Sequence, residues 1–381
     1  MERQMKVMTI LGTRPEIIRL SCVMALLDKY VVHKIVHTGQ NYDYELNEVF
    51  FRDLNVRKPD YFMNVDTSSL GRVYGNVLIC SEEIFKKEKP DAVLILGDTN
   101  SSIAGIIAKR LKIPIYHMEA GNRCFDLNVP EEINRRIIDH ISDFNLVYTE
   151  HARRHLLSEG LPHRRIFVTG SPMKEVLMTH MKEIEASDAL QKLSLERNGY
   201  FLASIHREEN VDNKENLLQL LAALKGISKE HGLPVIVSTH PRTRKRLAHL
   251  SERNVPSKIR FLKPFGFIDY VNLQMNARCV ISDSGTVCEE SAILSFPAVT
   301  VRNAIERPEA LDAGTIIMTG LNPDVIMAAI RHQTSPGIKD AAYHVPPEYE
   351  ITDTSKRVVK LILGTSKLSH LWDNIKPSDL C

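Results

Sequence analysis

Residues 92–121, AVLILGDTNSSIAGIIAKRLKIPIYHMEAG, indicate the fold class of this chain. Two short apolar runs, 92–97 and 114–118, flank an amphipathic stretch at 101–110. A continuous apolar run is typical of a strand that is buried on both faces of a sheet, and parallel strands need a crossover helix between them. The segment therefore predicts a strand–helix–strand unit of a parallel sheet.

The same alternation extends along the chain in both directions. Strands are predicted at 6–12, 33–38, 92–97, 114–118, 146–149 and 166–169, with helices at 16–29, 44–54, 70–88, 101–110, 131–141 and 150–159. After a polar helical stretch at 171–198, strands are predicted at 200–205, 234–239, 259–262, 279–282, 298–301 and 315–318. We expect an α/β protein with two Rossmann-like domains, residues 1–170 and 171–364. Residues 354 to about 371 are predicted as helix, and we expect the C-terminal part, about 365–381, to pack back on the first domain.

Composition limits the classes of partner. The 381 residues are 43% hydrophobic and 25% charged, as in ordinary globular proteins. A net charge of +2 without charge blocks implies neither a nucleic acid nor a membrane surface as partner. The six cysteines are scattered without a C-x-x-C pair, which predicts reduced thiols and no metal site. The apolar run at 7–11 is too short for a signal sequence, so we expect a cytoplasmic protein.

Polar residues that follow predicted strands are the first candidates for a site, because ligands bind outside the carboxyl ends of strands in open α/β sheets. The first strand is followed by GTRPE (12–16). Its glycine permits a tight turn, and a helix N-terminus with Arg14, and Arg19 one turn further on, suits a phosphate. An ordinary strand–helix turn with solvated arginines is the alternative.

Carboxylates follow the next two candidate strands. Asp98 comes after 92–97, and Glu119 comes after 114–118. Two carboxylates that converge on one crevice have pKa values pushed apart, which suits acid–base chemistry. The alternative for Asp98 is a helix cap. Glu131 opens a helix, where a carboxylate favours the helix dipole, and it becomes a candidate because the loop 121–129 returns it towards Glu119.

Histidines follow two strands of the second half. His206 lies in HREEN (206–210), and His240 follows the strand at 234–239. A histidine at a strand end can shuttle a proton or bind a phosphate, although a lone histidine is more often structural. Two cationic strand ends in one domain favour an anionic ligand.

The segment at 283–290, DSGTVCEE, joins a strand to a helix through a turn that contains Ser284 and Gly285. Exposed backbone amides in such a turn form a diphosphate cradle, and Glu290 can accept hydrogen bonds from ribose hydroxyls. Arg307, in ERPE (306–309), follows the next strand and can close over a nucleotide. Capping and turn chemistry is the alternative. Neither G-x-G-x-x-G after the first strand nor G-x-x-x-x-G-K-[ST] is present, so both common nucleotide fingerprints are missing.

Taken in order, the motifs resemble those of the non-hydrolysing UDP-N-acetylglucosamine 2-epimerase family. The matching segments are GTRPE (12–16), GDT (97–99), EAG (119–121), PEEINR (130–135), HREEN (206–210), His240, DSG-x3-EE (283–290) and ERPE (306–309). The resemblance implies a glycosyltransferase-B-like fold, in which the two domains face a central cleft, and a homodimer. It also implies that UDP is eliminated across C1–C2 and re-added through a 2-acetamidoglycal. Such a reaction needs no nicotinamide, because nothing is oxidised, and we expect neither a cofactor nor a metal.

The resemblance also implies roles for single residues. Catalytic positions of the family match Asp98, Glu119, Glu131 and His206, and UDP-binding positions match Arg14, Arg19, His240, Ser284, Gly285, Glu290 and Arg307. The expected partner is a UDP-activated 2-acetamido sugar.

Three segments depart from the common family pattern. Glu208 replaces a second arginine, the loop GNRCFDLNVPEE (121–132) is shorter than usual, and NYDY (41–44) replaces a polar, basic segment. In the common enzymes these regions contact the sugar or a second, activating UDP-N-acetylglucosamine. The departures resemble a subgroup that converts UDP-2-acetamido-2,6-dideoxy-L-talose to UDP-N-acetyl-L-fucosamine for capsule or O-antigen synthesis. Phe125 or Tyr42 would contact the sugar where its 6-hydroxyl is missing.

Three other functions stay open. Interconversion of UDP-N-acetylglucosamine and UDP-N-acetylmannosamine would use the same residues. A glycosyltransferase would release UDP permanently, and the carboxylate cluster argues against it. A non-catalytic sugar-nucleotide sensor would not need ionisable side chains at all four catalytic positions.

Overall fold

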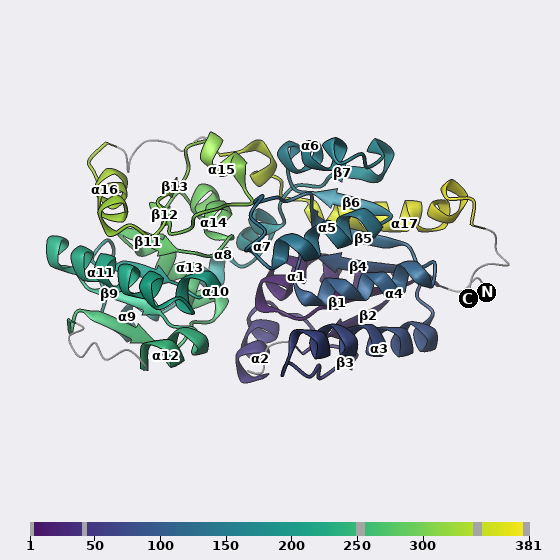
Figure 1. The fold of residues 1–381 in the computed structure, drawn as a ribbon, viewed down its shortest axis with the longest axis horizontal. Helices are drawn as coiled ribbons and strands as arrows, with labels where there is room; N and C mark the ends of the chain where they lie inside the picture. Colours follow the sequence, from purple (N-terminus) through teal and green to yellow (C-terminus); the bar gives the residue numbers. More distant parts are fainter. Residues whose placement is uncertain (1–3, 40–43, 249–255, 338–344, 376–381) are drawn as a thin grey trace. The chain divides into compact units, whose positions relative to one another are not determined.

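The computed structural model describes residues 4–39, 44–248, 256–337 and 345–375 (Figure 1). The chain forms two compact units, Met1–Thr179 with Glu348–Cys381, and His180–Pro347. None of the helices in the described ranges combines the length and apolar content that a membrane crossing needs.

Within the described residues, the first unit holds a parallel sheet in the order β3-β2-β1-β4-β5-β6-β7. Its strands are β1 (Lys6–Leu11), β2 (Val32–His37), β3 (Tyr61–Phe62), β4 (Ala92–Leu96), β5 (Ile115–Ala120), β6 (Phe144–Val147) and β7 (Ile166–Val168). Its helices are α1 (Arg14–Tyr30), α2 (Tyr44–Asp53), α3 (Leu70–Glu88), η1 (Asn100–Ile103), α4 (Ala104–Arg110), α5 (Glu131–Ile141), α6 (Glu150–Ser158), η2 (His163–Arg165), α7 (Met173–Thr179) and α17 (Thr354–Trp372). The short η3 (Pro347–Tyr349) spans the boundary between the units.

The second unit holds a parallel sheet in the order β10-β9-β8-β11-β12-β13. Its strands are β8 (Phe201–Ser204), β9 (Val235–Ser238), β10 (Ile259–Leu262), β11 (Cys279–Ser282), β12 (Ala298–Thr300) and β13 (Ile317–Met318). Its helices are α8 (Met181–Glu185), α9 (Ala189–Leu193), α10 (Glu208–Val211), α11 (Lys214–His231), α12 (Pro241–Ala248), α13 (Phe267–Asn276), α14 (Val287–Leu294), α15 (Pro308–Asp312) and α16 (Pro323–Gln333).

The strand order of both sheets locates the places where a ligand can bind. In each sheet the order reverses at one point, between β1 and β4 in the first unit and between β8 and β11 in the second. Connections leave these neighbouring strands in opposite directions, and ligands of open α/β sheets bind outside the carboxyl ends of the strands at such a point. The fully buried β4 and β11 bring the polar residues that follow them to these points.

The two parallel-sheet α/β arrays confirm the predicted fold class. The two-residue strand β3 was not predicted, because it pairs with β2 at the edge of the sheet and is too short to form an apolar run.

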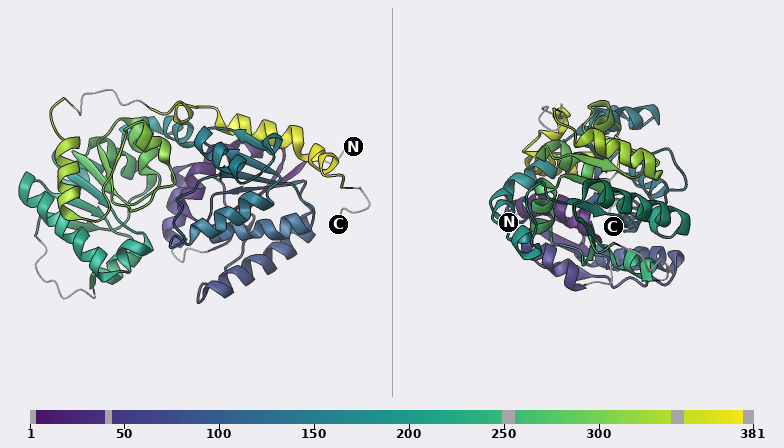
Figure 2. Two further views of the ribbon diagram at one scale, coloured as in Figure 1. Left: turned by 45° about the horizontal axis from the view of Figure 1, so that its top comes forward. Right: turned by 90° about the vertical axis from the view of Figure 1, so that its left-hand side faces the viewer.

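The structure divides the chain at different residues from the predicted 170 and 364. Helix α7 stays with the first unit because it buries Met173, Val176 and Leu177 there. The whole of α17 also belongs to this unit and packs against α1, as two views of the ribbon show (Figure 2). Thr365 on α17 bonds to the Tyr116 hydroxyl at 2.7 Å. Of the predicted C-terminal helix, residues 376–381 lie outside the described ranges.

Candidate functional site

The turn after β1 is organised by Glu16. The backbone N–H groups of Gly12 and Thr13 donate to its Oε2 at 2.7 and 2.6 Å, and the Thr99 hydroxyl donates to its Oε1 at 2.7 Å. Thr13 and Glu16 thus form a capping box at the start of α1, and the same carboxyl group reaches the turn after β4. A Cβ at Gly12 would stand 2.1 Å from the Thr38 Oγ1, so the turn requires glycine. Glu16 therefore joins the two chain segments on either side of the first strand-order reversal.

The pH dependence of stability should report on Glu16. Burial raises its pKa to about 7 against a normal 4.5, although hydrogen bonds from Thr99, Gly12 and Thr13 oppose the shift. A carboxyl group with a raised folded-state pKa stabilises the fold below its unfolded pKa, and this contribution is lost as the pH rises through the folded pKa. The stability of the native protein relative to Glu16→Gln should fall by about 3 kcal/mol between about pH 4 and about pH 8. Urea denaturation of both proteins across this range measures it, and a constant difference would contradict the assignment.

Arg14 and Arg19 take different positions on α1. The Arg14 guanidinium lies over the Phe50 ring, 5.8 Å from its centroid. Arg19 is buried, lies over the Tyr148 ring and forms an ion pair with Glu119. The sequence placed Arg19 beside a phosphate, and the structure pairs it with a candidate catalytic carboxylate.

Glu119 lies at a bulge of β5. Its φ is +65°, and the pairing of β5 with β6 shifts register between Met118 and Ala120. A non-glycine residue in the left-handed region costs about 1 kcal/mol or more, and such bulges re-aim side chains near functional sites. The Glu119 Oε2 lies 3.5 Å from the position of a Cβ on Gly97. The bulge therefore brings this carboxylate to the end of β4.

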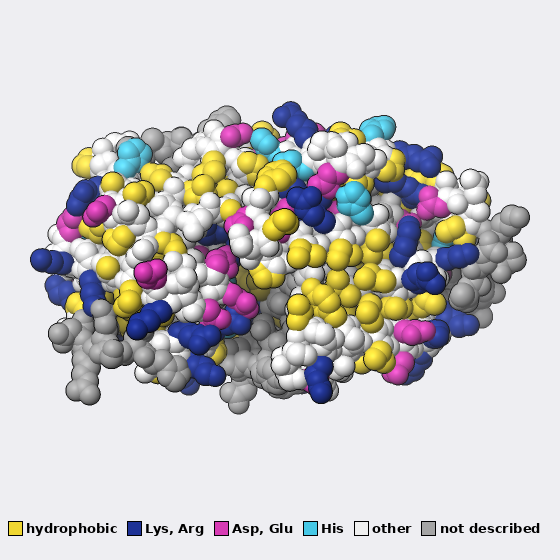
Figure 3. Space-filling model, viewed as in Figure 1, with side chains coloured by type: hydrophobic (Ala, Val, Ile, Leu, Met, Phe, Trp, Pro, Cys, Tyr) yellow, Lys and Arg dark blue, Asp and Glu magenta, His cyan; other side chains and the backbone are white. Residues whose placement is uncertain are grey.

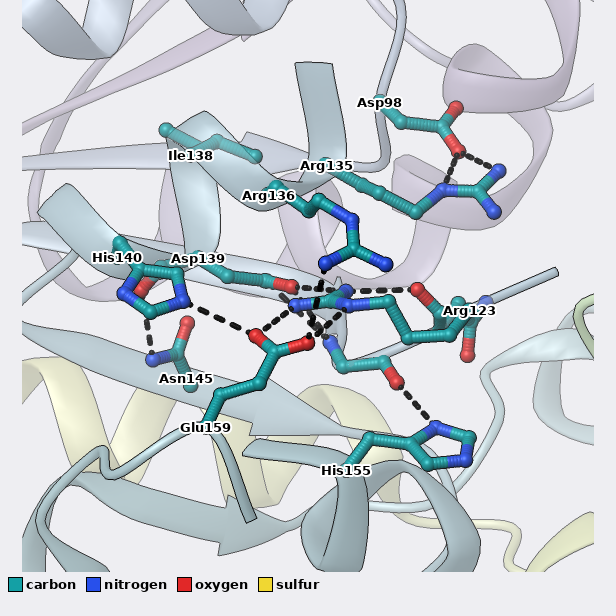
Figure 4. Close-up of polar contacts among 12 residues, drawn as sticks. Asp98, Arg123, Arg135, Arg136, Ile138, Asp139, His140, Asn145, His155 and Glu159 are labelled. Carbon is teal, nitrogen blue, oxygen red and sulfur yellow. Dashed lines mark hydrogen bonds and ion pairs between the residues drawn. The ribbon is translucent and has the colours of Figure 1, made fainter. Parts of the chain in front are cut away.

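Asp98 follows the same strand end and is held by Arg135. The Arg135 Nε and Nη2 donate to the Asp98 Oδ2 at 3.0 and 2.6 Å (Figure 4). Within the described ranges no hydrogen bond reaches the other oxygen, Oδ1, which leaves it available to a substrate. Thr99 caps η1 with its hydroxyl, so Asp98 is not the helix cap that the sequence left open.

The two glutamates at the start of α5 differ in their surroundings. Glu132 is fully buried and accepts hydrogen bonds from the Arg135 Nη1 at 2.8 Å and the Cys124 N–H at 3.2 Å. Glu131 is half-buried, and its charge, after burial, helps to raise the pKa of Tyr74. The Tyr74 hydroxyl donates to Asn134 at 2.7 Å, and Asn134 donates to the Asp98 carbonyl oxygen at 3.0 Å. Asp98 and Glu119 thus lie at the ends of β4 and β5, and Glu131 begins α5, the helix whose Arg135 holds Asp98.

In the second unit, His206 and Asp283 follow β8 and β11, the two strands between which the strand order reverses. The Asp283 carboxylate accepts the backbone N–H groups of His206 and Arg207 at 3.0–3.1 Å, and its Oδ1 lies 3.2 Å from the His206 Nδ1. Burial alone would raise the pKa of Asp283, but the His206 charge and the hydrogen bonds lower it to about 2. The His206 ring is half exposed, and its centroid lies 6.2 Å from that of His240. The two predicted histidines therefore lie together, and Asp283 is the residue that holds His206.

The remaining predicted residues lie around the turn after β11. Ser284 bonds through its hydroxyl to the Thr286 hydroxyl at 2.9 Å, and a Cβ on Gly285 would stand 2.8 Å from the Glu306 Oε1. Glu290 accepts a hydrogen bond from the Gln274 Nε2 at 2.7 Å. Arg307 is buried, with its Nε 3.3 Å from the Glu289 Oε1. The described residues hold no group of three or more His, Cys, Asp or Glu side chains placed for a metal ion.

Comparison with known proteins identifies the family. The family model described as UDP-N-acetylglucosamine 2-epimerase matches residues 26–363. The chain belongs to this epimerase family. It is similar to a solved UDP-N-acetylglucosamine 2-epimerase from Rickettsia bellii, with 49% identity, a TM-score of 0.90 and 97% and 98% coverage of the two chains. It is also similar, at 36% identity and a TM-score of 0.87, to the Methanocaldococcus jannaschii enzyme solved with UDP-GlcNAc and UDP, covering 94% and 99% of the two chains.

A family member with another substrate is also similar to this chain. The UDP-2,3-diacetamido-2,3-dideoxy-D-glucuronate 2-epimerase of Pseudomonas aeruginosa is 33% identical over 88% of this chain and 94% of its own. This epimerase is thus a sugar-nucleotide isomerase with a glycosyltransferase-B-like fold, and its substrate is a UDP-sugar.

The sequence did not predict the partners of the candidate residues in this epimerase. Arg135 lies in the PEEINR segment and Glu16 in GTRPE, yet neither was singled out for a role. His117, Arg123 and Asp139 gave no signal beyond their ordinary places in a strand, a loop and a helix.

Proposed function

We propose that the protein inverts C2 of UDP-2-acetamido-2,6-dideoxy-L-talose to give UDP-N-acetyl-L-fucosamine for capsule or O-antigen synthesis. The reaction would be an anti elimination of UDP through a 2-acetamidoglycal, followed by re-addition. The observation that carries the choice of sugar is an exposed aromatic ring at Phe125, close to the Glu119 bulge.

Phe125 supports a sugar that lacks a 6-hydroxyl. Its φ is +55°, its side chain is 67% exposed, and its ring meets the His155 ring edge-on at 5.4 Å. The His155 Nδ1 is 2.9 Å from the Gly121 carbonyl oxygen, so the ring is tied to the chain two residues after Glu119. An apolar ring suits a methyl group at C6 and offers no hydrogen-bond partner to a hydroxyl, which favours the 6-deoxy sugar. Tyr42, the other candidate, lies outside the described residues.

Glu208 also supports a different ligand from that of the common enzymes. It begins α10 and forms an ion pair with Arg242, two residues after His240. An arginine at position 208 would repel Arg242 instead. Compared with the common enzymes, the charge at position 208 is therefore reversed. By the resemblance, this segment contacts the sugar or an activating sugar nucleotide.

We propose that carboxylates of the first unit transfer the proton at C2. One carboxylate takes the C2 proton as the C1–O bond to UDP breaks and C1=C2 forms, and a second donor returns a proton to the opposite face. The C2 hydrogen is weakly acidic, so the base must be held in contact with it. Asp98, Glu119 and Glu131 are the proposed carriers. Arg135 and Arg19 offset two of the three negative charges.

The second unit is proposed to bind UDP through His240, Ser284, Gly285, Glu290 and Arg307, with His206 as its proton carrier. The family resemblance adds Arg14 and Arg19 of the first unit as proposed UDP ligands. Developing charge on the departing diphosphate is stabilised by guanidinium groups and turn amides.

Proton NMR in D2O tests the substrate. Each sugar nucleotide, the L-talose derivative and UDP-N-acetylglucosamine, is incubated with the purified protein, and the C2 signal is followed. We expect inversion and deuterium at C2 of the L-talose compound, with little of either in the glucosamine compound. Turnover of the glucosamine compound alone would overturn the proposal.

Phe125→Asn should slow the L-talose reaction by about tenfold through lost apolar contact.

UDP-N-acetylglucosamine 2-epimerisation is the second candidate. It is favoured because the similar proteins from Rickettsia bellii and Methanocaldococcus jannaschii are UDP-N-acetylglucosamine 2-epimerases. The same NMR experiment distinguishes the two reactions.

We also propose a cytoplasmic homodimer, following the family resemblance. Hydrophobic side chains gather on one face of the first unit, over α4 and α5 (Figure 3). Ile133 on α5 is 53% exposed, and Ile79 on the adjacent α3 is 58% exposed. A second copy would cover this apolar surface. Sedimentation equilibrium should give twice the 43.2 kDa of one chain, and a monomer mass would overturn the proposal.

A further inference from the structure

Four side chains form a buried ionic network behind the candidate carboxylates. It runs from Glu159 through Arg123 to Asp139 (Figure 4) and on to His117. Arg123, Asp139 and His117 are at most 1% exposed, and Glu159 lies at the outer end. Burying a charge costs free energy unless the charge is paired and hydrogen-bonded, so a buried ionic network of four side chains needs an explanation.

The His117 end of the buried ionic network fixes Gly97, the residue before Asp98. The His117 Nε2 lies 2.9 Å from the Gly97 carbonyl oxygen, and its Nδ1 lies 2.8 Å from the Asp139 Oδ1. The carbonyl oxygen only accepts, so Nε2 carries a hydrogen. Gly97 has a φ of +73° and ends the buried strand β4, so this hydrogen bond sets the direction in which the backbone continues to Asp98.

Asp139, in the middle of the buried ionic network, fixes the bulge at Glu119. The Gly121 N–H donates to both Asp139 oxygens, at 3.1 Å to Oδ2 and 3.3 Å to Oδ1. Gly121 has a φ of +79°, and a Cβ there would stand 2.4 Å from the Ala152 carbonyl oxygen. The strained turn that aims the Glu119 carboxylate is therefore held by Asp139 from one side and packed against α6 from the other.

Arg123 keeps Asp139 in place. Its Nη1 donates to the Asp139 Oδ2 at 2.6 Å and to the Asn122 carbonyl oxygen at 2.7 Å. Its Nε and Nη2 form a two-point pair with Glu159 at 2.8 and 2.7 Å. Hydrogen bonds from Arg123 help to lower the pKa of Glu159 to about 2, so this anchor stays ionised. The loop after the bulge is thereby fixed to α6.

We infer that Asp139 and His117 are positioning residues for the epimerase reaction. Through one carboxylate and one imidazole they hold the two chain segments that carry Glu119 and Asp98. The inference rests on the proposed roles of those two carboxylates. Neither positioning residue needs to touch the substrate, and a small displacement of the reacting groups is enough to slow the reaction strongly.

Asp139→Asn is the first test, because it preserves volume but removes one acceptor. Both oxygens of Asp139 accept from the Gly121 N–H, and Oδ2 also accepts from Arg123, so in asparagine the amide NH2 must replace one of these acceptors and the charge that pairs with Arg123 is lost. We expect kcat to fall by about 10–100-fold with KM and UDP affinity largely unchanged. C2 deuterium exchange should fall in parallel.

The matched control is Asp143→Asn. Asp143 is buried at 7% exposure and accepts the Ile115 N–H at 2.9 Å, so it holds the opposite end of β5. Its other oxygen accepts Lys109, whose side chain is 43% exposed and free to shift. We expect Asp143→Asn to lower the unfolding midpoint while kcat stays near that of the native protein.

A second variant, His117→Gln, covers the case in which Asp139→Asn does not fold. The glutamine amide can still donate to the Gly97 carbonyl oxygen but loses the contact with Asp139. It should also lower kcat more than KM. Equal kcat in the native protein and both positioning variants would overturn the inference, as would equal kcat losses in Asp139→Asn and Asp143→Asn. Glu119→Gln is measured alongside, and undiminished exchange in that variant would instead contradict the proposed catalytic role.

Discussion

Asp98→Asn is expected to lower C2 epimerisation and C2 deuterium exchange by about 10³-fold while UDP binding is retained. The asparagine fills the same volume, and its carbonyl oxygen can still accept the two hydrogen bonds from Arg135. It cannot accept or deliver a proton, so only the chemical step is lost. Proton NMR in D2O measures the exchange, and titration calorimetry with UDP measures binding.

Asp91→Asn is the control for this prediction because Asp91 lies at the opposite end of the same strand. Its Oδ2 accepts the Lys6 N–H at 2.7 Å, far along β4 from the candidate site. Exchange should be close to native in this variant. Native exchange in Asp98→Asn as well would show that the carboxylate cluster does not carry the proton transfer.

The strands and the candidate carboxylates could be predicted because each leaves a local signal. A strand that is buried on both faces needs a continuous apolar run, as at β4. The residue after such a run lies at the ligand edge of the sheet, which singled out Asp98, Glu119 and His206. The roles of these residues are still predictions, whereas their positions at strand ends are observed.

The partners of the carboxylates left no such signal. Arg135 reaches Asp98 and Asp139 reaches Gly121 only because the fold brings α5 against the ends of β4 and β5. The left-handed conformation of Glu119 was also hidden, because the sequence places a glycine at 121 and none at 119. Tertiary contacts fix both features.

The predicted domain boundary at residue 170 coincides with a local turn, and not with the point where the two units divide. Gly170 has a φ of +82°, and a Cβ there would stand 2.5 Å from the Ile351 Cδ1, so it marks a tight turn inside the first unit. The Thr354 hydroxyl bonds to the Ser171 carbonyl oxygen at 3.2 Å, which ties the returning chain to this turn. The signal was local, whereas the boundary depends on which unit buries α7.

Arg135→Met should lower the free energy of unfolding by about 3–5 kcal/mol, because it leaves buried negative charge without its main partner. Arg135 is 3% exposed and bonds both Asp98 and the fully buried Glu132. Methionine has a similar length and no charge, so packing is largely kept. The kcat should fall as well, because the Asp98 carboxylate loses the donors that orient it. Urea denaturation at neutral pH measures the stability.

Arg136→Met provides the comparison within the same helix turn. Arg136 also bonds Glu132, at 3.0 Å, but its side chain is 41% exposed and can exchange that contact for water. A partly exposed ion pair contributes about 0–1 kcal/mol, so this variant should stay within about 1 kcal/mol of the native protein. Similar losses in both variants would mean that the buried Arg135 contributes no more to the stability of this end of α5 than the partly exposed Arg136, which would contradict the prediction. A large loss of kcat in Arg135→Met alone would instead tie the orientation of Asp98 to the same guanidinium that neutralises Glu132.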